Sequence, residues 1–529
     1  MKYFSKIIIS SAPIFFILFI ISFIFILSIT NCLAVNYYVA PNGEDTNNGL
    51  SYSTPYKTFQ RAVNQANPGD TIYALGGIYD ISNTATETCS GTRTAFAIIC
   101  YNAKSGNSTH RITIRNYPGE NPILNASNSA IGHAIIINRR SYWTIQGLEI
   151  IGKEIQMMDG TTPANANHDI IIRDNKIHDV FMPNNGDNYG LIFINRGDST
   201  GDPYNIFIWN NTLYNLYIGG EIMSPNYNKA AITLMSICSY DINNPSLPCT
   251  GYVEIENNTI YNVGHAFHFK NAMYGPIKVY NNNIHTAIRL GISRASNVRL
   301  IKNMIYNLNG GFRMIGTDDI QDTDYHFNAT GQNYVIENNT MVGIEGMLEE
   351  MYNGKNHIIK NNIFFGLTTP RGGSRAYIDK SHLYPDSPNP LNSTLQTITS
   401  NNNCFITPTT NFQFVLRRVT PIEYYNYDEA KNMFGFDTNS VIIIESNASK
   451  IFVDPTNNDY HLIDTGMCPG MGYYGDEGQA ISCILPFDFE PCNCINNTEL
   501  FNTINAWNFG QITIQQLITN IKTWKQCSN

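Results

Sequence analysis

Two basic residues, Lys270 and Arg294, are the strongest candidates for chemistry in this chain of 529 residues. A lysine that gives up its proton can act as a general base, and an arginine can neutralise a carboxylate or assist a leaving group. Together they offer a base and a positive charge, which suit a proton transfer beside a developing negative charge. The alternative is that both are solvent-facing residues of a passive surface. The neighbours that could contact the same ligand are His265, His268, Asn271, Tyr261 and Tyr274.

An acidic segment lies further along the chain at residues 318–324, with the sequence DDIQDTD. Concentrated carboxylates on one loop suit a hard cation such as calcium, and we expect Asp318, Asp319 and Asp322 to be its ligands. Two of these aspartates could instead act as the acid and the base of a glycosidase. A solvated acidic loop without a ligand is the third alternative.

A phrase of the form Ile-x-Asn-Asn-x-Ile recurs through the middle of the chain and indicates how these residues are positioned. The asparagines two residues before the apolar position are separated by 36, 47, 24, 21, 36 and 22 residues. Steps near 22 fit one bare coil of a repeat, and longer steps fit a coil plus a loop. Lys270 and Arg294 are 24 residues apart, so we expect them on adjacent coils and on the same outward face. The repeating asparagines are Asn175, Asn211, Asn258, Asn282, Asn303, Asn339 and Asn361.

This repeat predicts an all-β fold, a parallel solenoid whose coils are too short to bury their apolar faces alone. Only 14% of the residues are charged, and the abundance of Asn, Ile, Tyr and Thr favours strands and polar turns. An asparagine at each corner tolerates the left-handed backbone of a tight bend. Stacked asparagine side chains can also hydrogen-bond from coil to coil.

Both ends of the repeat region resemble known proteins. The segments YYVAPNG at 37–43 and TPYKTFQRA at 54–62 open the region, and FVDP at 452–455 lies near its end. Together with the repeat they resemble the pectate-lyase-like right-handed parallel β-helix proteins over residues 36–485. The resemblance implies that a short helix at 55–65 caps the open end of the solenoid, with Phe59, Ala62 and Val63 facing inward.

The resemblance also implies a reaction and a partner. Many proteins of this group cleave uronic-acid polysaccharides by β-elimination, so an acidic polysaccharide is the expected partner. Lys270 and Arg294 are similar to a site of the alginate lyase and chondroitinase B type, in which a strand lysine is the base and an arginine one coil later assists. Acidic residues upstream of the lysine hold calcium in those enzymes, whereas this chain has His265 and His268 there. The aspartates of 318–324 resemble the calcium-binding set of another pectate lyase group.

The two ends of the chain predict three regions. Residues 1–34 carry Lys2 and Lys6 before a long apolar run, which is typical of a signal peptide or an N-terminal anchor. Residues 35–485 are expected to form the β-helix. Residues 486–529 contain an apolar pattern that returns after 17 residues with helical spacing, which predicts a helical hairpin. We therefore expect a secreted, extracellular or cell-surface protein, with membrane anchoring if the N-terminal segment is kept.

The composition indicates whether nucleic acid is a partner and whether disulfides are expected. The formal charge is −9 and no run rich in Lys and Arg stands out, so nucleic acid is not an expected partner. The chain has 11 cysteines, and an exported chain of this kind is expected to form disulfides. Nearby pairs such as Cys89 and Cys100 could each close a loop. We expect a monomer.

One hypothesis for the function and two alternatives follow. The leading hypothesis is a polysaccharide lyase that cleaves a uronic-acid polymer by β-elimination, with Lys270 as the base and Arg294 as its helper. The first alternative is a non-catalytic surface β-helix that binds glycans or partner proteins. The second alternative is a glycoside hydrolase.

Overall fold

The computed structural model describes most of the region that the repeat occupies. The described residues are 34–89, 91–158, 166–184, 189–195, 203–222, 229–235, 251–270, 276–293, 295–308, 310–314, 333–344, 346–349, 356–366, 377–381, 397–408, 414–418 and 423–475. Nearly all of the predicted signal peptide or anchor, and the whole of the predicted hairpin at 486–529, lie outside them. Among the described residues, no helix is both long enough and apolar enough to cross a membrane.

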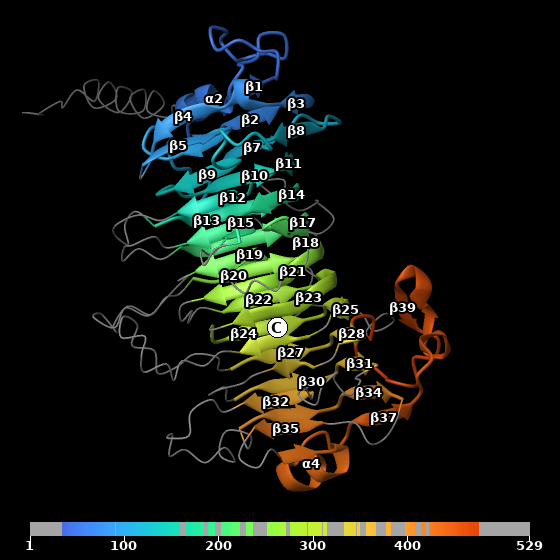
Figure 1. The fold of residues 1–529 in the computed structure, drawn as a ribbon. Helices are drawn as coiled ribbons and strands as arrows, with labels where there is room; N and C mark the ends of the chain where they lie inside the picture. The colour runs from blue at the N-terminus through green and yellow to red at the C-terminus, as the bar shows by residue number, and fades with distance from the viewer. Residues whose placement is uncertain are drawn as a thin grey trace, which may run out of the picture.

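Parallel strands stack into an elongated solenoid (Figure 1). Among the described residues, the first sheet has 12 strands, which follow one another in chain order from one end of the solenoid to the other. Neighbouring strands pair in parallel, as Ile206 does with Val253 and Ile208 with Ile255. The strands are β1 (Asn36–Val39), β2 (Thr71–Ala74), β7 (Ile112–Asn116), β10 (Trp143–Gln146), β13 (His168–Arg173), β16 (Tyr204–Trp209), β20 (Val253–Glu256), β22 (Ile277–Tyr280), β24 (Val298–Ile301), β27 (Val335–Glu337), β30 (Ile358–Lys360) and β33 (Thr399–Asn401).

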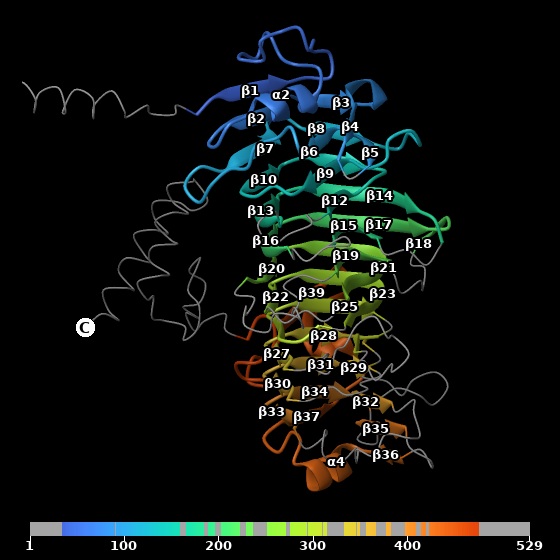
Figure 2. The same ribbon diagram turned by 90° about the vertical axis from the view of Figure 1, so that its left-hand side faces the viewer.

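The second sheet has 23 strands in the described part of the chain and wraps the rest of the solenoid (Figure 2). Its two longest strands, β21 and β23, have 12 and 11 residues. The predicted all-β parallel solenoid is therefore confirmed. The strands are β3 (Gly77–Tyr79), β6 (Ala97–Ile99), β8 (Pro122–Asn125), β9 (Ile135–Asn138), β11 (Glu149–Ile151), β12 (Ile155–Met158), β14 (Lys176–Met182), β15 (Tyr189–Asn195), β17 (Thr212–Ile218), β18 (Glu221–Ile222), β19 (Lys229–Met235), β21 (Thr259–Lys270), β23 (Asn283–Ser293), β25 (Met304–Leu308), β26 (Phe312–Met314), β28 (Thr340–Val342), β29 (Leu348–Glu349), β31 (Ile363–Phe365), β32 (Ile378–Ser381), β34 (Cys404–Thr407), β35 (Val415–Arg418), β36 (Glu423–Tyr425) and β37 (Val441–Ile444).

A continuous apolar core fills the solenoid, from Val39 in the first coil to Phe436 beneath the last. One inward position of the first sheet is an aliphatic residue in coil after coil, and each of these side chains is fully buried. Burying one such side chain contributes roughly 1.5–3 kcal/mol, so stacking supplies the stability that a single coil lacks. The members of this row include Ile72, Ile114, Ile145, Ile172, Ile208, Ile255, Val279, Leu300, Ile336 and Ile359.

Helix α2 (Phe59–Gln65) caps the N-terminal end of this core. Its residues Phe59, Ala62 and Val63 are buried, which confirms the predicted inward face. The helix begins at Phe59 and not at the predicted residue 55. The reason is that the Thr58 side chain accepts a hydrogen bond from the backbone of the first turn and so caps the helix at this point.

The Asn-Asn repeat divides two roles between its two residues. The first residue of each pair has a left-handed backbone, with φ of 55° at Asn210, 55° at Asn257 and 53° at Asn281. Asparagine visits this region more readily than most side chains, because its short amide can hydrogen-bond locally. The second residue is buried and places its side chain inside the corner. These buried asparagines are Asn175, Asn211, Asn258, Asn282, Asn303, Asn339, Asn362 and Asn403.

The buried asparagines form a hydrogen-bonded ladder along the solenoid, as stacking predicted. The Oδ1 atom of Asn282 accepts from the backbone N and from the Nδ2 of Asn258, at 2.9 and 3.0 Å. The Nδ2 atom of Asn282 donates to Oδ1 of Asn303 at 2.9 Å. It also donates to the carbonyl oxygen of Ile255 at 2.9 Å. Each asparagine therefore satisfies polar groups of the coils on both sides.

The structure corrects one step of the predicted repeat. The sequence pattern aligns Met341 with Ile363, whereas the strands pair Met341 with Phe364. The ladder accordingly runs from Asn339 to Asn362, a step of 23 residues and not 22. Ile363 and Phe364 are both apolar, so periodicity alone could not choose between them.

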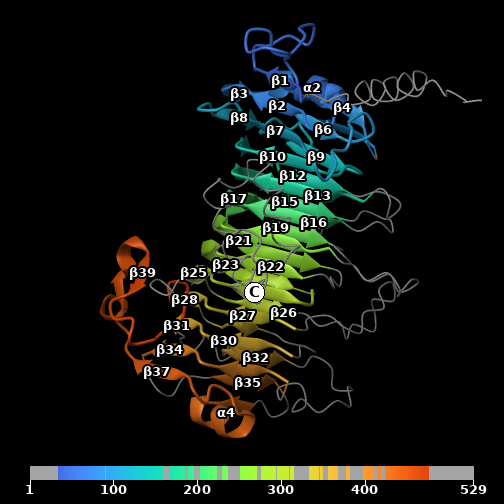
Figure 3. The same cartoon turned by 180° about the vertical axis from the view of Figure 1, so that it is seen from behind.

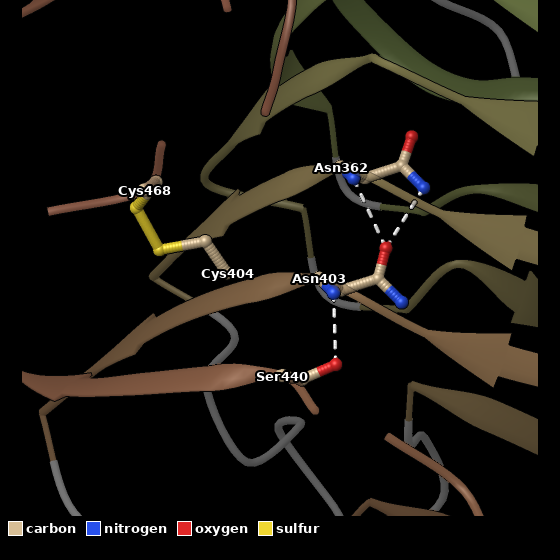
Figure 4. Close-up of a disulfide and its surroundings, with 5 residues drawn as sticks. All are labelled: Asn362, Asn403, Cys404, Ser440 and Cys468. Carbon is tan, nitrogen blue, oxygen red and sulfur yellow. Dashed lines mark hydrogen bonds between the residues drawn. A yellow bond between two sulfur atoms is a disulfide. The ribbon is translucent and has the colours of Figure 1, made fainter. Parts of the chain in front are cut away.

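The ladder ends at a cluster of polar side chains beneath the last coil (Figure 4). The backbone N of Asn403 donates to the hydroxyl of Ser440, and its Nδ2 donates to Oδ1 of Asp437, both at 2.8 Å. Asp437 also accepts from the hydroxyls of Ser400 and Ser440 at 2.6 Å. Burial raises the pKa of Asp437, and these three donors oppose that rise. Serine and aspartate side chains therefore replace the next asparagine.

The chain turns back along the solenoid after β37. Residues 445–475 lie beside the lower coils (Figure 3), and they include the antiparallel pair β38 (Phe452–Asp454) and β39 (Asp459–Leu462). A disulfide between Cys468 and Cys404 of β34 fastens this segment (Figure 4). Helix α4 (Tyr427–Phe434) lies at the C-terminal end of the core.

The asparagine ladder predicts that neighbouring asparagines contribute very different amounts to the free energy of unfolding. We expect Asn282→Ala to lower the free energy of unfolding by roughly 3 kcal/mol or more, because it leaves buried donors and acceptors of two coils without partners. The exposed neighbour Asn283→Ala is the control and should cost no more than about 0.5 kcal/mol. Denaturant titration followed by circular dichroism measures both. Equal losses would contradict a stabilising ladder.

Candidate functional site

Three neighbouring strands, β19, β21 and β23, carry the candidate site. Thr233 of β19 pairs with His268 of β21, which pairs with Ile292 of β23. Phe267 and Phe269 on either side of His268 belong to the core, so His268 points to the outer side of the sheet. We call this line of side chains the outer row. Its members in order are Ile98, Ile136, Gln156, Phe193, Thr233, His268 and Ile292.

Five basic side chains are concentrated on these three strands. Lys229 and His265 have no exposed surface, and Arg289 is only 7% exposed. His265 pairs in register with Arg289, so the two side chains point to the same side of the sheet. Buried lysine and arginine are uncommon in proteins, and together they favour an anionic ligand. We call this set the basic cluster, and its members are Lys229, His265, His268, Lys270 and Arg289.

One aromatic residue holds the ammonium of Lys229. Tyr189 of β15 pairs with Lys229, and the Nζ atom lies 5.8 Å from the centre of the Tyr189 ring. The hydroxyl of Thr233 donates to the carbonyl oxygen of Tyr189 at 2.6 Å. A cation over an aromatic face is stabilised by the ring quadrupole, and more strongly when both are desolvated. Lys229 and the aromatic ring that contacts its ammonium therefore belong to two adjacent coils.

The structure places four of the predicted site residues, of which Tyr261 lies nine residues from Lys270 and stacks between Tyr214 and His285. Lys270 is the last residue of β21 and is partly exposed, and His265 and His268 are buried on the same strand. β21 and β23 remain paired up to Phe269 and Ser293, the residues just before Lys270 and the predicted partner Arg294. The residues predicted to complete the site that lie outside the described part of the chain are Arg294, Asn271 and Tyr274.

The predicted calcium ligands Asp318, Asp319 and Asp322 also lie outside the described residues, so calcium stays a prediction. Within the described residues, no group of three or more His, Cys, Asp or Glu side chains is arranged to hold a metal ion. The described part of the site is dominated by cationic side chains, which suit an anion better than a metal.

Sequence reasoning missed Lys229 and Arg289. The signal for Arg289 is present, because it follows His265 by 24 residues, the same step that separates Lys270 from Arg294. Lys229 carries no such signal. A 35-residue interval separates Thr233 from its partner His268, and nothing in the sequence shows how much of that interval is loop.

A second feature of the outer surface is a row of stacked rings on β14, β17, β21, β23 and β25. Successive ring centres are 4.6, 4.8, 5.0 and 4.7 Å apart, and the planes are within 10° of parallel. The rings cover one another's faces; His178 and Tyr306 at the two ends are buried, and the three rings between them are partly exposed. We call this set the aromatic row, and its members are His178, Tyr214, Tyr261, His285 and Tyr306.

An acidic side chain lies at the N-terminal end of the aromatic row. The Oε1 atom of Glu149 is 3.0 Å from Nζ of Lys176 and 3.0 Å from Nε2 of His178. Burial alone would raise the pKa of Glu149, but hydrogen bonds from Asn121, Lys176 and His178 outweigh it and bring the pKa to about 2. His178 also lies 2.7 Å from Asp179 through its Nδ1 atom. Both carboxylates are therefore ionised over the physiological range.

Two further carboxylates project from the outer side of the first sheet. Glu254 and Glu256 of β20 flank the core residue Ile255, so both point outward. Glu254 lies 3.2 Å from Nζ of Lys278. Burial, followed by the charge of Glu254, raises the pKa of Glu256 to about 7. In register with Glu256, Trp209 lies on the strand before it.

Known proteins match part of this chain. Residues 37–217 match a family described as the Pel9A-like, right handed beta helix region. The pectate lyase PEL9 of Emericella nidulans is 35% identical over 120 residues, which are 22% of this chain and 28% of that protein. The chain thus matches little more than a quarter of the length of this relative. These matches confirm the resemblance to pectate-lyase-like right-handed β-helix proteins.

Solved structures are similar at low sequence identity. A rhamnogalacturonan lyase is 17% identical, with 66% of this chain and 87% of that chain covered and a TM-score of 0.42. The pectate lyase Pel9A is 15% identical, with 70% and 87% covered and a TM-score of 0.39.

The contacts of Glu149 predict a specific pH dependence of stability. The folded pKa of about 2 lies below an unfolded value of about 4.3, so the ionised carboxylate stabilises the fold above pH 4.3 and this contribution is lost as the pH falls towards 2. We expect wild type to be more stable than Glu149→Gln at pH 6, with the difference shrinking in acid. Thermal unfolding at a series of pH values measures this. Exposed Glu221→Gln is the control, and a pH-independent difference for Glu149→Gln would refute the assignment.

Proposed function

We propose that this chain is a secreted polysaccharide lyase that cleaves a uronic-acid polymer by β-elimination. The observation that carries the proposal is the basic cluster, in which Lys229, Arg289 and His265 are buried on the same three strands as the partly exposed Lys270. A uronate polymer brings one carboxylate per acidic sugar, and positively charged strands attract it. The match to a pectate lyase over part of the chain supports the same class of reaction.

The first requirement of the reaction is to make the C5 proton of the uronate removable. The carboxylate next to C5 must accept the negative charge that develops as the proton leaves, and cations in a water-poor site stabilise that charge most effectively. In this proposal Arg289 and Lys229, which are buried, add positive charge to the strands that carry the site.

The second requirement is a base that reaches the proton. Lys270 projects from the same outer face as His268, two residues away on β21, and it is the partly exposed member of the basic cluster. The neutral form of a lysine is the form that accepts a proton. We therefore assign Lys270 as the base, and Arg294 as its helper at the carboxylate or at the leaving oxygen. Calcium at Asp318, Asp319 and Asp322 is part of the proposal, but no step depends on it.

A second candidate function, glycoside hydrolysis, is favoured by Glu254 and Glu256. Hydrolases use two carboxyl groups, of which one is protonated at the working pH and the other is ionised. Neighbouring outward positions on one strand lie roughly 6.6 Å apart along the backbone, so the two side chains share one face of the sheet. A pKa of about 7 suits Glu256 to the role of the acid.

The lyase proposal predicts that the unsaturated product is formed by the wild type and largely lost in Lys270→Ala. Incubation with pectate, alginate and chondroitin, followed by ultraviolet absorbance of the unsaturated product, should give activity on at least one polymer. Lys270→Ala should lower kcat by roughly 100-fold or more, because it removes the base. Lys360→Ala, an exposed lysine of the first sheet paired with Glu337, is the matched control and should keep full activity.

One outcome would contradict lyase activity, and a second would contradict the assignment of Lys270 as the base. Binding of a uronate polymer with no unsaturated product from any of the three would favour the non-catalytic surface β-helix. Full activity of Lys270→Ala would remove Lys270 from the reaction.

The hydrolase candidate predicts a reducing-end product without a double bond. Its rate should fall as the pH rises through about 7, because Glu256 then loses its proton. Glu256→Gln should abolish it, whereas Glu337→Gln, which changes another outward glutamate of the same sheet, should not. A rate that is unchanged in Glu256→Gln would exclude this assignment.

A further inference from the structure

A β-hairpin covers the N-terminal end of the outer row. Its strands are β4 (Ala85–Thr88) and β5 (Thr92–Ala95), which pair antiparallel (Figure 1). Cys89 lies directly after β4, and its backbone N donates to the carbonyl oxygen of Gly91 at 2.8 Å. The chain then continues through β6 to Cys100. Cys89 therefore lies near the turn of the hairpin, and Cys100 lies directly after β6, where the chain has returned to the solenoid.

The hairpin packs on the solenoid through a small apolar cluster of its own. The cluster consists of Cys89, Ala95, Ile98, Cys100 and Ile136, and both cysteines are buried in it as thiols. The two sulfur atoms are within hydrogen-bonding reach of each other. The Cys100 sulfur also lies 3.9 Å from the carbonyl oxygen of Thr88. Two buried thiols of one apolar cluster, with neighbouring sulfur atoms, are candidates for a disulfide.

We propose that Cys89 and Cys100 form a disulfide that fastens the β4–β5 hairpin to the outer surface of the solenoid. The Cys404–Cys468 disulfide fastens residues 445–475 to the other end of the second sheet. The solenoid would then carry one covalently fastened cover towards each end. Oxidation is expected in a secreted protein, where small-molecule disulfides are available.

The oxidation step can be assigned to specific atoms. The hydrogen bond from the Cys89 thiol lowers the pKa of Cys100, which favours Cys100 as the first nucleophile. Its thiolate attacks one sulfur of a small-molecule disulfide such as oxidised glutathione, and the first thiol leaves. Cys89 then loses its proton and attacks the Cys100 sulfur, and the second thiol leaves. Two electrons pass from the cysteines to the small disulfide, and the two protons end on the two released thiols.

The position of the hairpin gives the bond a consequence for the outer row. Ile98 and Ile136, which the hairpin covers, begin the row that continues to Thr233 and His268 of the candidate site. Arg93 of β5 extends along this face and brings its Nη2 within 3.9 Å of the Met158 sulfur. A fastened hairpin would form a fixed wall at one end of the row. A reduced hairpin would be held by the small apolar cluster and by backbone hydrogen bonds, such as the one from the N of Gly132 to the carbonyl oxygen of Thr94 at 3.0 Å.

Peptide mapping tests the bond on the full chain without any substitution. The protein is folded with oxidised glutathione, alkylated under denaturing conditions and digested. We expect a Cys89–Cys100 cross-linked peptide that disappears after reduction. Recovery of both residues as alkylated thiols, or linkage of either to another cysteine, would overturn the proposal.

Hydrogen exchange tests what the bond does. Amides of residues 85–95 should exchange roughly 10-fold faster in Cys89→Ser/Cys100→Ser than in the oxidised wild type, because local opening of the hairpin becomes easier. The control is Cys404→Ser/Cys468→Ser, which should leave exchange in 85–95 unchanged and increase it in residues 445–475. Equal exchange of 85–95 in the wild type and in Cys89→Ser/Cys100→Ser would show that the bond does not fasten the hairpin.

Discussion

The architecture depends on satisfying backbone polar groups at a tight corner that every coil repeats. A corner removes backbone donors and acceptors from the strand ladder and also buries them, which costs free energy for each group left without a partner. The buried asparagines meet this need with a side chain that donates and accepts at once. Each one, such as Asn282, bonds the coil before it and the coil after it. The coils can therefore differ widely in loop length and still stack.

A ladder of this kind leaves the outward positions available for other roles. Inward positions are restricted to aliphatic and aromatic side chains, and corner positions to asparagine and its left-handed neighbour. The outward residues alone can vary in charge from coil to coil, and they do so in three ways. Basic residues gather on β19, β21 and β23, stacked rings follow the aromatic row, and carboxylates project from β20.

Residues beyond the regular coils decide which outward positions are covered. The β4–β5 hairpin shields the first outward positions of the outer row. Residues 445–475 cover a second cluster that includes Tyr306, so the aromatic row ends beneath Tyr460 at 5.1 Å. The β4–β5 hairpin is attached through a small apolar cluster and residues 445–475 through a larger one, and each cluster contains a pair of cysteines.

The sequence by itself determined the solenoid, its asparagine ladder and the inward face of the capping helix, because these follow from local periodicity and from residue chemistry. It also pointed to Lys270, His265 and His268, since their strand is part of the regular repeat. The 24-residue step from His265 also points to Arg289, whereas only the tertiary structure placed Lys229 on the neighbouring strand. The register between coils depends on loop lengths that the repeat does not specify, as the 23-residue step from Asn339 to Asn362 also shows. The burial of Lys229 is likewise a property of the packed coils and cannot be read from the repeat.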